Sequence, residues 1–240
     1  MQNYHGRDIA IIGMACVYPG APNLRSFWQN ILAKFDAVTE ASERWGGNHC
    51  YDPESVDNDR IYCNKGGFIE EFAQFDPTVF GIIPRSVDGG DPEHFLALKL
   101  AYESLDDAGY LSRPFNREKT AVILGRGPFL NRSNVSVLQH GLIIDQTLQI
   151  LKQLHPETSE TELQRIKQRL KESLPPFNAD TVPGAIPNLA SGRIANRLDL
   201  QGPNFTIDAA CASSLLALDA GIKELLSRRC DMAIVGGVQA

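Results

Sequence analysis

The sequence contains few cysteines, and they show no pattern typical of a zinc site or a disulfide framework. There are five, an odd number, with no C-x-x-C pair and no Cys/His pairing at zinc spacing. They are Cys16, Cys50, Cys63, Cys211 and Cys230. We therefore expect no bound metal. Free thiols of this kind suit a reducing compartment, so the expected location is the cytoplasm.

Basic charge, long apolar runs and phosphate-binding loops are also missing. The formal net charge is −6 and the pI about 5.4, so no positive field would attract nucleic acid or an anionic membrane. No apolar stretch approaches the ~18 residues of a spanning helix, and no basic segment followed by an apolar one opens the sequence. Neither of the glycine-rich nucleotide-binding motifs, G-x-G-x-x-G and G-x-x-x-x-G-K-[ST], occurs, so we expect no cofactor bound by this chain.

What the sequence does contain is a set of apolar runs separated by helical patterns. With 240 residues, 43% of them hydrophobic, the chain can bury a substantial core. The runs at 8–15, 120–124, 204–207 and 231–240 are typical of buried strands. Helical patterns cover 23–35, 92–108, 186–200 and 212–226, and residues 39–67 form a long polar loop. This alternation predicts a parallel α/β layer.

Two further helices are predicted between residues 133 and 174. The second begins with the capping box Ser159-x-x-Glu162 and ends before Pro175-Pro176. Its charged face is typical of a solvated surface and indicates no binding function. A histidine near the start of another helix, His94, is interpreted as a structural residue.

Cys211 lies where a predicted strand, 204–207, changes into a predicted helix. A cysteine at such a corner faces unpaired helix N–H groups and the positive end of the helix dipole, and both favour the thiolate. The neighbouring residues are all small, so an acyl group could approach, and the Cys211 N–H could donate to an oxyanion. The alternative is a buried cysteine that acts as a small hydrophobe.

The string Asp-Ala-Ala-Cys-Ala-Ser-Ser-Leu, residues 208–215, resembles the nucleophile motif of the β-ketoacyl synthases, the condensing enzymes of fatty acid and polyketide assembly. Residues 66–85 resemble a stretch of modular polyketide synthases. However, Gly90-Asp-Pro-Glu-His-Phe95 stands where those enzymes have Met-Asp-Pro-Gln-Gln-Arg. The helical insertion around 133–174 resembles the equivalent region of polyunsaturated fatty acid synthases. The resemblance covers nearly the whole chain, from Asp8 to Ala240.

The resemblance implies a thiolase-like α/β fold, with residues 1–240 as the N-terminal domain, the first of two similar halves. It also implies that Cys211 accepts an acyl chain from the phosphopantetheine arm of an acyl carrier protein. The acyl thioester is then condensed with a malonyl group after decarboxylation. Two histidines serve that second step in the family and normally lie in the second half. None of the five histidines here stands in a matching motif, so we expect the chain alone not to complete condensation.

The resemblance further implies a homodimer and a larger multidomain synthase as partners. Three other interpretations stay open at this point. A thiolase or chain-initiating synthase would share the fold. A non-catalytic module would bind carrier protein or act as a dimer scaffold. An unrelated cysteine hydrolase would need a histidine base, and none stands at a recognised spacing from Cys211.

Overall fold

A three-stranded parallel sheet organises the molecule. The computed structural model describes residues 8–43, 45–127 and 131–239. The central strand β3 (Thr120–Gly125) is buried at every residue and lies between β4 (Asn204–Ile207) and β5 (Met232–Gly237). Val122 stands opposite Asn204 on one side and Ile234 on the other. Three of the four predicted strands are thereby confirmed, although β4 and β5 are only partly buried.

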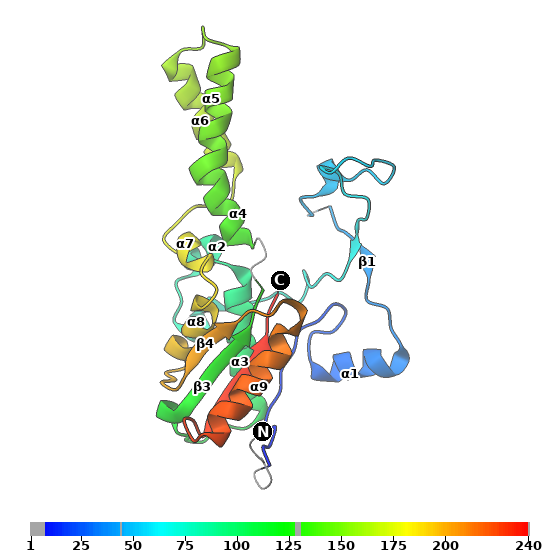
Figure 1. Cartoon of the computed structure of the whole chain (residues 1–240), viewed down its shortest axis with the longest axis vertical. Helices are drawn as coiled ribbons and strands as arrows, with labels where there is room; N and C mark the ends of the chain where they lie inside the picture. Colours follow the sequence, from blue (N-terminus) through cyan, green and yellow to red (C-terminus); the bar gives the residue numbers. More distant parts are fainter. Residues whose placement is uncertain (1–7, 44, 128–130, 240) are drawn as a thin grey trace.

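Helices cover both faces of this sheet. Helix α9 (Ser213–Leu226) packs against β3 and β5, while α8 (Leu189–Arg197) lies against the opposite face and α3 (Pro92–Asp107) packs on α8 (Figure 1). The approach of α9 is close, because a Cβ added to Gly221 would stand 2.5 Å from Val235 Cγ1. The core therefore forms mainly between β3, α8 and α3, which contribute the buried residues Phe95, Leu98, Leu105, Val122, Leu124, Ala190 and Ile194.

The predicted helical insertion projects from the body as a long arm (Figure 1). Helix α4 (Arg132–Leu138) continues through the π-helical turn η4 (Gln139–Ile143) into α5 (Ile144–Leu154), and α6 (Glu160–Ser173) returns beside α5. The predicted cap is confirmed, since Ser159 Oγ accepts from the Glu162 N–H at 3.2 Å. Lys167 on α6 also reaches Asp145 on α5 at 2.7 Å.

The N-terminal segment differs from the prediction. Residues 8–15 belong to no strand, and Ile11 is 75% exposed, so the expected buried strand is wrong. A strand needs a neighbour to pair its backbone groups, and no described strand is hydrogen-bonded to this segment. Helix α1 (Leu24–Ala33) is confirmed with its Asn23 cap, although its apolar face is exposed (Figure 1).

Short elements complete the described chain. In the loop predicted at 39–67, the described residues form a short antiparallel pair, β1 (Thr39–Glu40) with β2 (Lys65–Gly66), the turn η1 (Asn48–Cys50) and an isolated bridge between Tyr51 and Ile61. Beyond it, Phe75 stacks on Phe80 and also contacts Phe95 of α3, with ring centroids 5.2 and 5.1 Å apart. The other short elements are η2 (Pro77–Phe80), α2 (Pro84–Gly89), η3 (Arg117–Lys119) and α7 (Thr181–Gly184).

Candidate active site

Cys211 lies in a single 3-10 turn, η5 (Ala210–Ala212), between the end of β4 and the start of α9. Its side chain is exposed, so the buried-cysteine interpretation is wrong. The turn stands at the carboxyl ends of the parallel strands, the edge at which ligands of open α/β sheets bind. The thiol is therefore open to a substrate that approaches this edge.

The backbone immediately before Cys211 is strained. Ala210 has a φ of 49°, in the left-handed region that residues with a Cβ rarely adopt. Such a conformation costs ~1–3 kcal/mol and persists only where its surroundings hold it. Here Asp208 Oδ1 accepts from the Ala210 N–H at 3.0 Å. Ser213 Oγ accepts from the Ala209 N–H at 2.8 Å and donates to the Ala210 carbonyl at 2.7 Å. These bonds fix the turn that presents Cys211.

Two strand-end glycines allow the start of α9 to come close to the sheet. A Cβ at Gly125 would stand 2.4 Å from the Ser213 carbonyl carbon, and one at Gly237 would stand 2.8 Å from Ser214 Cβ. Any side chain at Gly125 would push against backbone atoms two residues beyond Cys211. Sequence patterns did not reveal this role. The only signal in the sequence was that a glycine ends each of two apolar strands.

His94, interpreted from the sequence as a structural residue, lies inside the fold. It is completely buried at the start of α3, and neither ring nitrogen has a hydrogen-bond partner among the residues that the structure describes. Burial, with Arg126 and Arg193 nearby, lowers the pKa of His94 to about 3. The ring is therefore neutral near pH 7. Within the described ranges, no histidine forms a hydrogen bond with the Cys211 thiol.

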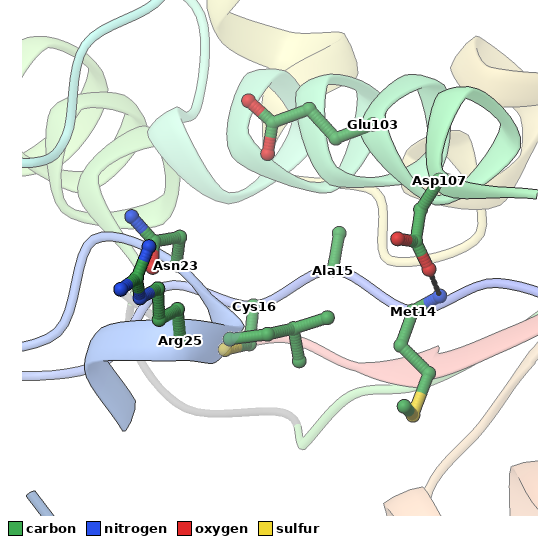
Figure 2. Close-up of a pocket in the computed structure, with 8 residues that line it drawn as sticks. Met14, Ala15, Cys16, Asn23, Arg25, Glu103 and Asp107 are labelled. Atoms are coloured by element: carbon green, nitrogen blue, oxygen red, sulfur yellow. Dashed lines mark hydrogen bonds between the residues drawn. The ribbon is translucent and has the colours of Figure 1, made fainter. Parts of the chain in front are cut away.

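A separate hollow of about 300 Å³ lies between residues 14–16, the start of α1 and the second half of α3 (Figure 2). The Met14 N–H donates to Asp107 Oδ2 at 2.9 Å across it, and the Glu103 carboxylate stands over the same space. Burial, with help from Glu103, raises the pKa of the Cys16 thiol. Cys16 therefore stays protonated, and Cys211 does not line this hollow.

No cluster of three His, Cys, Asp or Glu side chains among the described residues is placed to hold a metal ion. None of the helices in the same residues has the length and apolarity needed to cross a membrane.

Known proteins share both the fold and the sequence pattern. A ketosynthase from module 6 of the bacillaene synthase of Bacillus subtilis superposes with a TM-score of 0.67 at 28% identity. The superposition covers 96% of this chain and 31% of that one. An oxazolomycin synthase ketosynthase domain from Streptomyces albus, 24% identical, has the same fold with a TM-score of 0.68. The fold is therefore thiolase-like, as predicted.

Residues 6–240 match the family described as "Beta-ketoacyl synthase, N-terminal domain". The chain belongs to this family. A polyunsaturated fatty acid synthase subunit from Thraustochytrium sp. is 32% identical over 231 residues, which cover 95% of this chain. The pikromycin polyketide synthase component PikAIII of Streptomyces venezuelae is 32% identical over 233 residues, or 96% of this chain. The chain spans only 8% and 13% of the length of these two relatives.

Proposed function

We propose that this chain supplies the nucleophile for a decarboxylative Claisen condensation in polyketide or fatty acid biosynthesis. The observation that carries the proposal is the exposed Cys211 on its strained, hydrogen-bonded turn at the carboxyl edge of the parallel sheet. Membership of the β-ketoacyl synthase family supports it. In this proposal Cys211 is the catalytic residue, and the chain is part of an acyltransferase.

The first step is acyl loading. The Cys211 thiolate attacks the carbonyl carbon of an acyl thioester carried on phosphopantetheine, and a new C–S bond forms to Sγ. The bond to the pantetheine sulfur then breaks, and that sulfur leaves as a thiolate that takes up a proton. The Cys211 N–H, at the start of the α9 region, is the proposed donor to the oxyanion that forms meanwhile.

The second step consumes the loaded acyl group. A malonyl thioester on a carrier protein loses CO₂, and the resulting carbanion attacks the acyl carbon on Cys211. The Cys211 thiolate leaves, and a β-ketoacyl carrier thioester forms. None of the five histidines stands in the motif that serves decarboxylation in the family, so we infer that other parts of a larger synthase provide these groups. An acyl carrier protein, a homodimer partner and a cytoplasmic location belong to the same proposal.

The test is acyl transfer to Cys211 in the full-length protein that contains this chain. The protein is incubated with an acyl carrier protein loaded with a short acyl group, and peptide mass spectrometry locates the acyl mass. We expect the acyl group on the peptide with Cys211 and no loading in Cys211→Ala. Cys63→Ala, which removes another exposed thiol, serves as the matched control and should load normally.

The outcome separates the candidate functions. Undiminished loading in Cys211→Ala would contradict the assignment. Stable binding of the acylated carrier without transfer would favour a carrier-binding or scaffold module. Hydrolysis of the thioester without a retained acyl-enzyme would favour a cysteine hydrolase.

A further inference from the structure

We propose that Arg126 is a positioning residue for Cys211, held in place by Asp91 and Glu93 at the start of α3. The inference rests on the proposed role of Cys211 as the nucleophile. Arg126 directly follows the central strand β3, and its side chain is only 3% exposed. A guanidinium in such a place must be paired, because an isolated buried charge is strongly unfavourable.

The partners of Arg126 are two buried carboxylates on a different layer of the fold. Its Nε donates to Glu93 Oε2 at 2.5 Å, and an Nη atom lies 3.8 Å from Asp91 Oδ1. Asp91 is itself fixed, since it accepts from the Glu93 N–H at 3.1 Å and from the Ser133 N–H at 3.4 Å. Burial and the neighbouring Glu93 raise the pKa of Asp91. The cluster therefore ties the end of β3 to the start of α3.

The backbone of Arg126 links this side-chain cluster to the turn that presents Cys211. Its N–H donates at 3.0 Å to the carbonyl of Ile207, the last residue of β4. The next residue along the chain is Asp208, whose side chain holds the strained Ala210. On the other side of Arg126, Gly125 lies against the backbone of Ser213. Residues 125 and 126 thus contact the chain both before and after Cys211.

Glu93 lies in the segment, residues 90–95, where this sequence departs from the pattern of modular polyketide synthases. The Glu93–Arg126 pair therefore links the residues that differ from those enzymes to the Cys211 turn. Neither side chain needs to touch substrate for this role. We expect the pair to determine where the Cys211 Sγ points and how openly the turn presents it to a reagent or substrate.

The experiment measures how fast each cysteine of the full-length protein is alkylated by iodoacetamide between pH 6 and 10. Peptide mass spectrometry follows the cysteines separately. Cys211 reports on the proposed site, exposed Cys63 on the reagent, and buried Cys230 on the integrity of the fold. The variants are Arg126→Met, which removes the charge, Glu93→Gln, which keeps the shape of its partner, and Arg126→Lys. The matched control is Arg165→Met, which breaks an exposed Arg–Glu pair on α6.

We expect Arg126→Met and Glu93→Gln to slow Cys211 alkylation at pH 7 about tenfold, because the turn then presents the thiol less openly. Arg126→Lys should recover part of the loss because it keeps the charge. Cys63 should react as before, Cys230 should stay protected, and the control variant should match the unmodified protein.

An unchanged Cys211 profile in folded Arg126→Met would overturn the proposal. If Cys230 becomes reactive in Arg126→Met, that variant has lost its fold. The test then uses Glu93→Gln and Arg126→Lys, and an unchanged Cys211 profile in these folded variants would overturn the proposal. The readout does not require acyl transfer. A protein in which alkylation responds as expected but no acyl group loads would contradict the proposed function while supporting the role of Arg126.

Discussion

At the scale of single residues, the side chains next to Cys211 hold the backbone turn that presents its thiol. Ser213 uses one hydroxyl to satisfy two backbone groups of the turn, and Asp208 satisfies a third. The strained Ala210 can persist beside Cys211 because these three bonds hold it. The turn is thus ordered without a substrate, which would lower the entropic cost of the proposed acyl transfer.

Because His94 is buried and neutral, we expect the folded chain to lose stability in acid. Its pKa is about 3 in the folded chain, below the ordinary value of 6.5. As the pH falls from 6.5 toward 3, the unfolded state binds a proton that the folded state does not, so the free energy of unfolding decreases by up to ~1.4 kcal/mol per pH unit. Asp91 acts oppositely, because its raised pKa adds stability as the pH falls. Because these two groups have opposite effects, only a substitution at His94 measures the contribution of this histidine to the pH dependence of stability.

We expect His94→Leu to reduce the loss of stability in acid while leaving the protein folded at pH 7. Leucine removes two buried nitrogens that lack partners among the described residues. Urea unfolding at pH 7, 6, 5 and 4 measures the slope. The control is His155→Leu, at an exposed histidine, which should keep the original slope. Equal slopes in His94→Leu and the unmodified protein would contradict the interpretation.

At the scale of elements, contact between strand ends and α9 determines the place of the turn that carries Cys211. Gly125→Ala would put a methyl group 2.4 Å from the Ser213 carbonyl carbon, which forces β3 and α9 apart. We expect the free energy of unfolding to fall by ~1–3 kcal/mol and Cys211 alkylation to slow. Denaturant unfolding and peptide-resolved alkylation measure the two effects.

Gly236→Ala is the control for this prediction. It adds a methyl group to the neighbouring strand, but its nearest neighbour is Leu124 Cδ2 at 3.9 Å, an ordinary contact. A similar loss of stability in both variants would show that the sheet tolerates no added methyl group. The interpretation that Gly125 allows the close approach of α9 to β3 would then be wrong.

Elements with a strong local pattern were predictable from the sequence. The cap at Ser159, the strand at 120–125 and the helix that starts at Pro92 depend on residues close in the chain. The segment 8–15 has an equally apolar pattern but forms no strand, because a strand also requires a neighbour that local sequence does not specify.

The site was predictable only in part for the same reason. Cys211 and its corner follow from adjacent residues. Gly125 and Arg126 reach the turn from a strand far earlier in the chain, and Glu93 reaches Arg126 across the core. Periodicity and motif spacing carry no information about such pairings.

At the scale of the whole molecule, large apolar side chains remain on the surface. Leu215 on α9 is 70% exposed and Trp28 on α1 is 60% exposed, while the side of α9 that faces the sheet carries Ala217 and Gly221. Exposed apolar residues in such number favour association. We expect the 240-residue chain expressed alone to self-associate.

Light scattering at increasing concentration measures this association. Leu215→Ser should reduce it. Val56→Ser, a substitution at a 96% exposed residue of the loop between β1 and β2, should have little effect. A chain that stays monomeric without substitution, or one that Leu215→Ser leaves equally associated, would contradict the prediction.

The strand order also has a consequence for synthesis on the ribosome. The central strand β3 is made before both of its neighbours, and the whole helical arm separates it from β4. A buried, mostly apolar strand therefore leaves the ribosome with no partner, and it stays unpaired until Asn204–Ile207 and then Met232–Gly237 emerge. Non-local pairing of this kind is slow, and unpaired strands are prone to aggregate. The arm has mostly local contacts, so it can fold during this wait, and the Cys211 turn forms only afterwards, because it follows β4 in the chain.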